Sequence, residues 1–435
     1  MSAHETPYFN RAVLEDRAQR LIQSFSNHLG SDDVVVICSG EPIQKPGGLD
    51  QSYPFLTHPD FYWLSGLQRP ESLFLYSKTE GLQLFIKKTS RDEQVWEGLN
   101  TQFEGRDVNE FESFFSKKKY RNIYVLGQAN SRMKSLENVS VEKHDEIQEA
   151  LNKVRRVKDD AEIALVKKAF QAAHAGYMQI RKIIRPGITE RQLQLEYEFA
   201  ALNAGAEKFP YDTLVGSGTN ASILHAIPSS RVLNKGEIVV IDAGADIQDY
   251  CVDITRVFAV DGTFTSKQKD IYDLVLKSQI AALELCRPSV SWSEVHLTAA
   301  RVLAQGLIEL KIAKGSTEAL VESGAISVFF PHGVGHMVGL RVRDVGGVPK
   351  PKAKLYAGVR IRVDIPLEEN FLMTVEPGLY FIKALIEDSN LQVKYKEHIN
   401  WSEVEKWKDF GGVRIEDNVL IKASGNDVIT SAVTK

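Results

Sequence analysis

Two aspartates stand in apolar, strand-like stretches near the middle of the chain. Residues 238–241 and 254–258 are predicted to be the strands of a β-hairpin with a turn-rich middle. Asp242 and Asp253 occupy places where a buried strand normally carries apolar side chains, and an unpaired carboxylate is costly there. No lysine lies nearby, and strand alternation puts Arg256 on the face opposite to Asp253. The pattern favours a metal ion as counter-charge, although two polar residues at strand ends would give the same letters.

The composition indicates a soluble globular protein. Hydrophobic residues make up 43% and charged residues 25% of the 435 residues, which is ordinary for folded chains and predicts two or three domains. The net charge of −4 argues against a surface for nucleic acids or anionic membranes. The basic residues 117–119 and Arg121 are expected to form a solvated face.

The amino terminus and the cysteines indicate a cytoplasmic, reduced protein. Residues 1–20 lack the apolar core of a signal peptide, and no run reaches the roughly 18 apolar residues that cross a membrane. Cys38, Cys251 and Cys286 are too few and too scattered for a disulfide framework or a zinc knuckle. Cys251 shares a strand face with Asp253, but a buried structural thiol is the preferred interpretation.

Residues 1–152 are expected to form a smaller amino-terminal α/β domain. A helix is predicted at residues 12–25, and strands are predicted at residues 34–38, 73–76, 82–86 and 123–125. An aromatic stretch occupies residues 53–66, and its His58 is expected to be structural. We find no nucleophile elbow, phosphate loop or ligand cluster in this part of the sequence.

A charge-dense segment at residues 152–160 marks the predicted domain boundary, so that the second domain covers residues 153–435. In this domain an order of two helices followed by strands occurs twice. The helices are predicted at residues 161–184, 189–205, 266–286 and 291–311, with capping boxes formed by Thr189 with Gln192 and by Ser291 with Glu294. The repeated order predicts an α+β domain with a pseudo-twofold β-sheet cupped by helices.

Three stretches of the second half place further charged or imidazole groups among apolar residues. FFPHGVGHMVGL contains His332 and His336, and the glycines between them argue for a strand or tight loop rather than a helix. FLMTVEPGLYFI carries Glu376 at the end of an apolar strand. In FGGVRIEDNVLI, Arg414 and Glu416 share a strand face.

These stretches complete a set of metal-ligand side chains, namely Asp242, Asp253, His336, Glu376 and Glu416. Four carboxylates and one imidazole suit divalent ions such as Mn²⁺, Co²⁺ or Zn²⁺. Because so many carboxylates would over-neutralise one ion, we expect two ions that share bridging carboxylates.

The order Asp–Asp–His–Glu–Glu, in the contexts IDAGADIQDYCVDITR, PHGVGH, TVEPGLYF and GGVRIEDN, resembles that of the pita-bread (creatinase-like) metallopeptidases. The resemblance is closest to their Xaa-Pro branch, which comprises prolidases and aminopeptidase P. It covers nearly the whole chain, because YPFLTHPDFYWLSGLQRPESL is similar to the amino-terminal domain of that branch. The resemblance implies a pita-bread catalytic domain, two divalent ions with Mn²⁺ favoured, and proline-containing peptides as substrates.

Within this branch the sequence favours a prolidase, which hydrolyses Xaa-Pro dipeptides. A long insertion separates the EPG strand from the RIED strand, and the ending NW…FGGVRIEDN resembles prolidases. Aminopeptidase P, which removes the residue before proline from longer peptides, is the alternative. A non-catalytic interaction protein with this fold is a second alternative, but the complete ligand set argues for an enzyme.

The resemblance also implies roles for residues around the ligands. Glu376 would take a proton from the attacking water as well as ligating, and His332 would lie near the leaving group. The residues expected to contact the substrate are His225, Arg362 and Arg414. Arg362, or Arg360 if the local alignment slips, would bind the terminal carboxylate of a dipeptide through its guanidinium fork.

One position departs from the family pattern. Where the family usually reads HGxGHxxGLxxHD, this chain has Arg343 in place of the last histidine. Arginine can stabilise an oxyanion but does not release a proton near neutral pH. We therefore expect an active enzyme with a lower rate or an altered substrate preference. A homodimer is also expected, in which the aromatic residues 53–63 could serve the interface or belong to the core.

Overall fold

The computed structural model describes residues 9–134, 136, 139–346 and 354–435. Residues 1–8, which belong to the stretch read above as lacking a signal-peptide core, lie outside this part. The chain divides into two compact units, Met1–Arg155 and Arg156–Lys435, called here the first and second unit. The sequence predicts the boundary between two independently folding domains at residues 152–153. This boundary stays a prediction, because a division into compact units does not measure independent folding.

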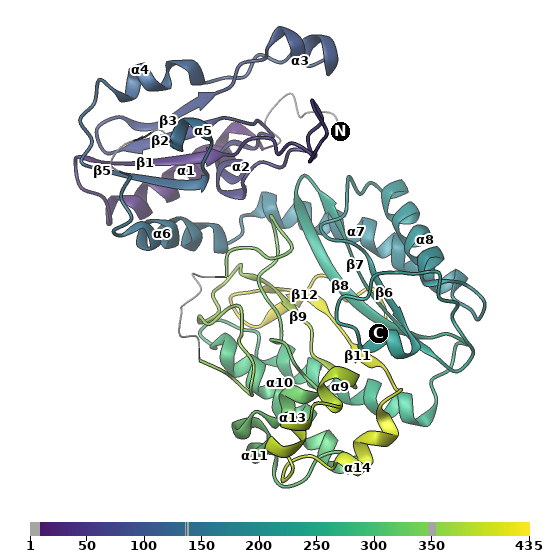
Figure 1. Ribbon diagram of the computed structural model, residues 1–435. Coiled ribbons are helices and arrows are strands. Elements are labelled where there is room, and N and C mark those ends of the chain that lie inside the picture. Colours follow the sequence, from purple (N-terminus) through teal and green to yellow (C-terminus); the bar gives the residue numbers. More distant parts are fainter. Residues whose placement is uncertain (1–8, 135, 137–138, 347–353) are drawn as a thin grey trace. The chain divides into compact units, whose positions relative to one another are not determined.

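The first unit is built on a five-stranded sheet in the order β4-β3-β2-β1-β5. Its strands are β1 (Asp33–Ser39), β2 (Leu73–Ser77), β3 (Gly81–Ile86), β4 (Arg106–Asp107) and β5 (Asn122–Gln128). Its helices are α1 (Arg11–Ser26), α2 (Pro59–Ser65), α3 (Arg91–Trp96), α4 (Phe111–Phe115), α5 (Ser131–Lys134) and α6 (His144–Arg156), with a 3-10 turn η1 (Val108–Glu110). The purple-to-blue part of Figure 1 shows this unit. The predicted helix and four predicted strands are present, which gives the expected α/β architecture.

The aromatic stretch of the first unit forms the short helix α2. Tyr62 and Trp63 are fully buried, whereas Tyr53 ahead of the helix is 51% exposed. His58 caps the helix, since its Nδ1 accepts a hydrogen bond from the backbone N–H of Asp60 (3.3 Å). The structural role expected for His58 is therefore confirmed.

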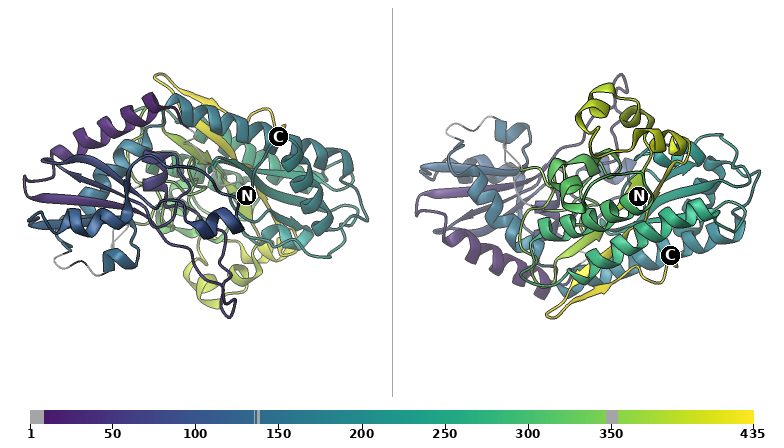
Figure 2. Two further views of the ribbon diagram at one scale, coloured as in Figure 1. Left: turned by 90° about the horizontal axis from the view of Figure 1, so that it is seen from above. Right: turned by 90° about the horizontal axis from the view of Figure 1, so that it is seen from below.

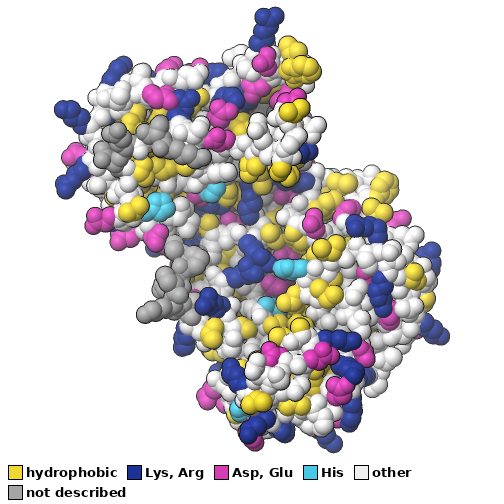
Figure 3. Space-filling view, in the orientation of Figure 1, with side chains coloured by type: hydrophobic (Ala, Val, Ile, Leu, Met, Phe, Trp, Pro, Cys, Tyr) yellow, Lys and Arg dark blue, Asp and Glu magenta, His cyan; other side chains and the backbone are white. Residues whose placement is uncertain are grey.

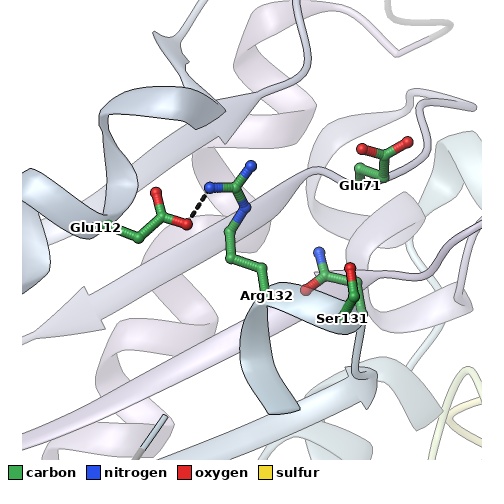
Figure 4. A pocket seen from close by; sticks show the side chains of 5 residues that line it. Glu71, Glu112, Ser131 and Arg132 are labelled. Carbon is green, nitrogen blue, oxygen red and sulfur yellow. Dashed lines mark hydrogen bonds and ion pairs between the residues drawn. The ribbon is translucent and has the colours of Figure 1, made fainter. Parts of the chain in front are cut away.

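The first unit also contains a cavity of about 350 Å³. Figure 4 shows Arg132 directed toward Glu112, with which it forms an ion pair, while Glu71 and Ser131 line the opposite side. Because the charges of Arg132 and Glu112 compensate each other, we assign no ligand to this cavity.

The second unit contains two successive sets of helices and strands. The first set has α7 (Asp160–Ile183), α8 (Glu190–Asn203), β6 (Leu214–Ser217), a 3-10 turn η2 (Gly218–Ser222), β7 (Ile238–Ile247) and β8 (Tyr250–Ala259). The second set has the helices α9 (Ser266–Glu284), α10 (Trp292–Glu309) and α11 (Thr317–Ser323), a 3-10 turn η3 (Ala325–Val328), and the strands β9 (Leu372–Val375), β10 (Gly378–Tyr380), β11 (Gly412–Arg414), β12 (Asp417–Ile421) and β13 (Asn426–Val428). The long insertion between β10 and β11 folds into α12 (Lys383–Ile386), α13 (Ser389–Lys394), α14 (Trp401–Val404) and η4 (Glu405–Trp407).

The helices of the second unit cover its sheets. Helix α7 packs on β7 and β8, and α9 packs on β9, β10 and β11. Figure 2 shows in its view from below how the green α9 and α10 run side by side in front of the strands. Buried residues of α9, α10 and the strands beneath them form one hydrophobic core. The sheet cupped by helices that the repeated order predicts is thus present.

Helix capping follows the sequence closely. The Thr189 hydroxyl accepts from the N–H of Gln192, whose side chain accepts from the N–H of Thr189, so this predicted capping box is complete. At Ser291 only one of the two hydrogen bonds of the predicted capping box is present, in which the Ser291 hydroxyl accepts from the backbone N–H of Glu294. Among the described residues we find no helix with the length and apolar character needed to cross a bilayer.

The central hairpin is longer than the sequence suggests. Strands β7 and β8 meet at a tight turn in which Gln248 and Asp249 both have positive φ angles (53° and 65°). The turn-rich middle predicted from the sequence is therefore mostly strand, and the aspartates lie within strands rather than at their ends. Asp242 pairs with Thr255, and Gly244 pairs with Asp253. Strand alternation consequently places both aspartates on one face as diagonal neighbours.

Buried polar contacts join the two halves of the second unit. A single antiparallel bridge connects Thr255 of β8 to Glu416. Arg256, on the opposite face, forms an ion pair with Asp417 (2.6 Å). The side-chain amide of Gln279 donates to the carbonyl oxygens of Val375 and Ile415. The contacts of Thr255 and Arg256 hold the hairpin of the first half against the second half, whereas Gln279 of α9 links Val375 to Ile415 within the second half.

Candidate metal centre

The structure brings three predicted ligands into one cluster. One ligand atom each of Asp253, His336 and Glu416 lie within 4.8 Å of one another. His336 Nε2 is 3.6 Å from a carboxylate oxygen of Asp253 and 3.6 Å from one of Glu376. The Tyr211 hydroxyl lies 2.8 Å from Asp242 and 2.5 Å from Asp253, so it links the two carboxylates. Three of the five predicted ligands therefore form one compact group, while Glu376 lies next to it through His336 and Asp242 through Tyr211.

Burial and mutual repulsion perturb the carboxylates of this site. The pKa of Asp253 is raised well above its usual value by burial and by the nearby charges of Glu416 and Asp242. The pKa of Glu416 is raised by burial, Glu376 and Asp242. Burial, opposed by Arg414 and assisted by Asp253 and Asp242, raises the pKa of Glu376 to about 8. A cluster that disfavours its own ionisation in this way is suited to bind cations, which would supply the missing positive charge.

His336 is oriented as a metal-ligating histidine. Its Nδ1 lies 3.0 Å from the carbonyl oxygen of Met337 and donates to it. Burial lowers the pKa of His336 to about 4, so the ring is neutral near pH 7. In this tautomer Nε2 carries a lone pair and faces Asp253 and Glu376. The donor set of one neutral imidazole and several carboxylates fits a pair of divalent ions.

Backbone pairing explains how distant stretches converge. The loop that carries His336 runs beside β9, since Thr374 N–H donates to the carbonyl oxygen of His336 (2.8 Å) and Glu376 N–H to that of Val334 (2.8 Å). A Cβ at Gly335 would lie 2.0 Å from the carbonyl oxygen of Thr374, so only glycine permits this approach. The loop conformation of the two histidines is as predicted.

Asn418 and Thr255 position the acidic ligands of β8 and of the β11–β12 connection. The Asn418 side chain pairs with both backbone groups of Asp253, at 2.9 Å to its N–H and 2.7 Å to its carbonyl oxygen. The Thr255 hydroxyl donates to Glu416 (2.6 Å). Both contacts join β8 to strands of the second half, so the cluster depends on the closure of the two halves.

Arg414 corrects one step of the sequence argument. Its Nη2 forms a 2.7 Å ion pair with Asp242, so the tertiary structure supplies a positive partner that the local sequence does not contain. Its other donors reach the hydroxyls of Thr255 (3.0 Å) and Tyr380 (3.0 Å). The sequence argument expected a metal at Asp242 because no positively charged residue lies near it in the sequence. That reason was wrong for Asp242, since Arg414 pairs with it in the structure. Arg414 is also expected to contact the substrate, and this stays a prediction. The three contacts described here use one N–H donor on each of the three guanidinium nitrogens.

Tyr380 connects Arg414 to His332. The Tyr380 hydroxyl accepts from Arg414 and lies 2.9 Å from His332 Nε2, while His332 Nδ1 lies 2.8 Å from the carbonyl oxygen of Gly333. The ring therefore donates through Nδ1 and accepts the Tyr380 proton at Nε2. Burial and Arg414 lower the pKa of His332 to about 3. Its Nδ1 is 3.9 Å from Glu376, which places this neutral histidine beside the cluster.

The sequence argument missed Tyr211, Thr255 and Tyr380. All three contact predicted site residues through hydroxyl groups. Tyrosines and threonines are common in buried strands for packing reasons alone, so no local signal distinguishes these three. Cys251, by contrast, is buried as expected, with its Sγ 3.4 Å from the carbonyl oxygen of Gly339.

Basic and imidazole side chains form an exposed rim beside the buried cluster. His225, Arg343 and Arg362 belong to this rim and are exposed. Arg360, the alternative to Arg362 in the sequence argument, is also exposed. The pKa of His225 is lowered by burial, Arg343 and Arg414, and that of Arg362 by burial and Arg343. Figure 3 shows histidine side chains next to basic and acidic ones on the visible face of the second unit. Exposed positive charge thus lies close to the carboxylate cluster.

The chain belongs to metallopeptidase family M24, whose pattern matches residues 164–423. Residues 14–120 match the amino-terminal domain of aminopeptidase P. The pita-bread fold and the closeness to aminopeptidase P expected from the sequence are therefore confirmed.

Relatives and solved structures agree on the branch. The chain is 32% identical to a probable Xaa-Pro aminopeptidase of Botryotinia fuckeliana over 397 residues, which is 88% of this chain and 86% of the relative. It is 31% identical to a probable Xaa-Pro aminopeptidase of Ajellomyces capsulatus, over 92% of this chain and 89% of the relative. Aminopeptidase P from Escherichia coli with the inhibitor Pro-Leu has a TM-score of 0.79 at 26% identity, over 98% of this chain and 96% of that one. These names favour the aminopeptidase alternative over the prolidase reading, which they do not confirm.

Proposed function

We propose that this protein is a two-metal Xaa-Pro aminopeptidase that removes the residue before proline from the amino terminus of peptides. The observation that carries the proposal is the grouping of Asp253, His336 and Glu416, with Glu376 3.6 Å from His336 and Asp242 linked to Asp253 through the Tyr211 hydroxyl. The names of the similar proteins supply the substrate class. Mn²⁺ is our proposed native metal, although a zinc-substituted form of the Escherichia coli protein is known.

The five ligands would hold two divalent ions, and those ions would polarise the scissile carbonyl and lower the pKa of a bound water. The residues around them bind and orient the peptide. An Xaa-Pro bond has no N–H, so recognition must rest on the carbonyl and on flanking groups. His225 and Arg343 at the rim can donate to the carbonyl oxygen as negative charge develops there. Glu376, beside His332, is placed to accept a proton at its carboxylate and pass it to the leaving nitrogen.

The prolidase activity remains a second candidate because of Arg362. This arginine is exposed and close enough to Glu376 and Arg343 for their charges to affect its pKa. A guanidinium at that place could bind a carboxylate one residue beyond the scissile bond. Such a contact would favour dipeptides over longer peptides.

Comparison of peptide lengths separates the two candidates. With Mn²⁺ present, we expect kcat/KM for an Ala-Pro-Ala tripeptide to exceed that for Ala-Pro by about tenfold, since the tripeptide removes the terminal carboxylate from the proline and adds a residue to bind. Product release followed by chromatography measures both rates. A higher kcat/KM for the dipeptide would contradict the aminopeptidase proposal and support the prolidase.

Replacement of Arg343 tests the departure from the family pattern. We expect Arg343→His to raise kcat/KM for Xaa-Pro peptides by about three- to tenfold, because an imidazole can donate a hydrogen bond and also exchange its proton near neutral pH. Steady-state kinetics between pH 6 and 9 would measure the effect. Arg301→His on the exposed side of α10 is the matched control. An unchanged kcat/KM for Arg343→His would exclude this residue from the reaction.

We also propose a cytoplasmic location and a homodimeric assembly. A cytoplasmic location rests on the sequence composition alone. A homodimer rests on the resemblance, and within residues 53–63 only the part ahead of α2 is available for contacts, since Phe61, Tyr62 and Trp63 are buried in the first unit.

A further inference from the structure

Glu190 is a buried carboxylate for which the proposed mechanism gives no role. It is the first residue of α8 and is fully buried. One of its oxygens, Oε1, accepts from the backbone N–H of Ser217 (2.9 Å), the Ser217 hydroxyl (2.8 Å) and the Asn220 amide (3.1 Å). The other, Oε2, accepts from the backbone N–H (3.2 Å) and hydroxyl (2.7 Å) of Ser229. Five donors thus converge on one side chain.

These donors come from the two ends of one irregular segment, residues 217–229. This segment begins at the end of β6 and includes η2, whereas residues 223–229 form no helix or strand. The charge-assisted contacts at Ser217 and Ser229 therefore help to determine its path. Arg231 strengthens the arrangement, because its Nη1 donates to the Ser217 hydroxyl (2.6 Å) and its guanidinium pairs with Glu237. Glu190 therefore acts as a clamp that closes the segment.

The clamped segment carries His225 and one wall of the site. Asn220, Ala221, Ile223 and Ala226 line a small cavity together with Asp242 and Arg414. The carbonyl oxygen of Ala226 also accepts from the N–H of Val215 in β6 (3.1 Å). The charges of Arg414 and Asp242 affect the pKa of His225, which agrees with its place above this wall. Displacement of either end of the segment would move His225 relative to the carboxylate cluster.

We propose that Glu190 is a positioning residue, which fixes residues 217–229 and thereby holds His225 in place to contact the peptide substrate. The kinetic part of this inference rests on the proposed peptidase function. The structural part, a clamp on residues 217–229, does not.

Glu190→Gln is the principal test. The new amide nitrogen faces either the donors of Ser217 and Asn220 or those of Ser229, so one end of the segment loses an acceptor. We expect kcat/KM for an Xaa-Pro tripeptide to fall about tenfold, while metal content stays unchanged. Hydrogen exchange of residues 217–229, measured on metal-free protein, should become faster in Glu190→Gln. Glu190→Asp, which keeps the charge but is one methylene shorter, should lose less protection and less activity.

A double-mutant cycle separates positioning from general destabilisation. If Glu190 acts through His225, adding Glu190→Gln to His225→Ala should lower kcat/KM by less than about threefold. Glu162→Gln is the matched control, because Glu162 is also a buried glutamate in the first turn of a helix, where it accepts from Tyr250. It should leave exchange in residues 217–229 unchanged.

Two results would overturn the inference. One is unchanged exchange of residues 217–229 in Glu190→Gln, and the other is a tenfold effect that persists fully in the His225→Ala background. Failure of the wild-type protein to cleave any Xaa-Pro peptide would refute the proposed function instead, and the exchange measurement would still decide whether Glu190 holds the segment.

Discussion

Replacing Asp253 by asparagine is expected to lower kcat/KM for Xaa-Pro peptides by about three orders of magnitude. The amide keeps the shape of the side chain but removes the charge that a divalent ion requires, and such ions supply several kcal/mol of transition-state stabilisation. Asp253 is 6% exposed and lies 3.6 Å from His336 Nε2, so its carboxylate is held inside the proposed metal site. Elemental analysis of the purified variant should show less than the full metal content.

Asp246→Asn provides a matched control for this substitution. Asp246 belongs to the same hairpin and is 4% exposed, but it lies toward the turn, where its carboxylate accepts from the N–H of Asp249. Burial raises its pKa to about 7, so near neutral pH the carboxyl group is about half protonated and the amide removes only part of its charge. We expect activity within about threefold of wild type. If Asp253→Asn kept more than a tenth of the wild-type kcat/KM in metal-supplemented buffer, Asp253 would not be a ligand.

Without metal, the protein should become less stable as the pH rises above neutrality, whereas the metal-bound protein should not. In the metal-free protein the folded-state pKa of Glu376, about 8, lies above its ordinary value of 4.5. The protonated folded state is therefore favoured at low pH, and this contribution is lost as the pH rises through about 8. Since one pKa unit corresponds to about 1.4 kcal/mol, the shift from 4.5 to about 8 amounts to roughly 5 kcal/mol at low pH, of which about 1.4 kcal/mol is still present at pH 7. We expect the Tm of chelated protein to fall between about pH 7 and pH 8.5.

The choice of this pH range excludes an opposing effect of the buried histidines. The pKa values of His332 and His336 are lowered to about 3 and about 4, so their contribution is present above pH 6.5 and is lost only as the pH falls. With Mn²⁺ bound, the ligands stay deprotonated and the Tm should hold or rise over the same range, because metal and protons compete. In chelated Glu376→Gln the slope should flatten. A Tm of the chelated wild type that rises from pH 7 to pH 8.5 would contradict this account.

The residues that the structure groups in the candidate site could be selected from the sequence because they violate local patterns. A carboxylate in an apolar strand, as at Asp242 and Asp253, or at the end of one, as at Glu376, costs free energy that only function or a partner can offset. The glycines beside His336 likewise indicated a close backbone approach, which Gly335 makes to Thr374. The helices were predictable for a related reason, since capping residues such as Thr189 act within one turn of the chain.

Contacts between residues far apart in the chain were not predictable. The sequence argument assigned no partner to Asp242, whereas Arg414, which is 172 residues away, pairs with it. The sequence argument also predicted too long a turn in the central hairpin. The turn is formed by Gln248 and Asp249, whose positive φ angles are not required by their residue types. The insertion before Arg414 led the sequence argument to favour a dipeptidase. The similar proteins are named Xaa-Pro aminopeptidases, which favours the alternative that acts on longer peptides.

The sequence by itself determined which residue types are present for metal chemistry and which stretches form helices and strands. These properties depend on hydrophobic periodicity, on caps and on polar residues in apolar places, all of which act over a few residues. The tertiary structure alone decided that Tyr211, Thr255 and Tyr380 join the site, that Arg414 neutralises Asp242, and that Glu190 closes the segment bearing His225. Some of these partners meet within one half of the second unit, as Tyr211 meets Asp242 and Tyr380 meets His332, and others only across the two halves, as Arg414 meets Asp242. In each case the hydrogen bond depends on position in space and not on separation along the chain.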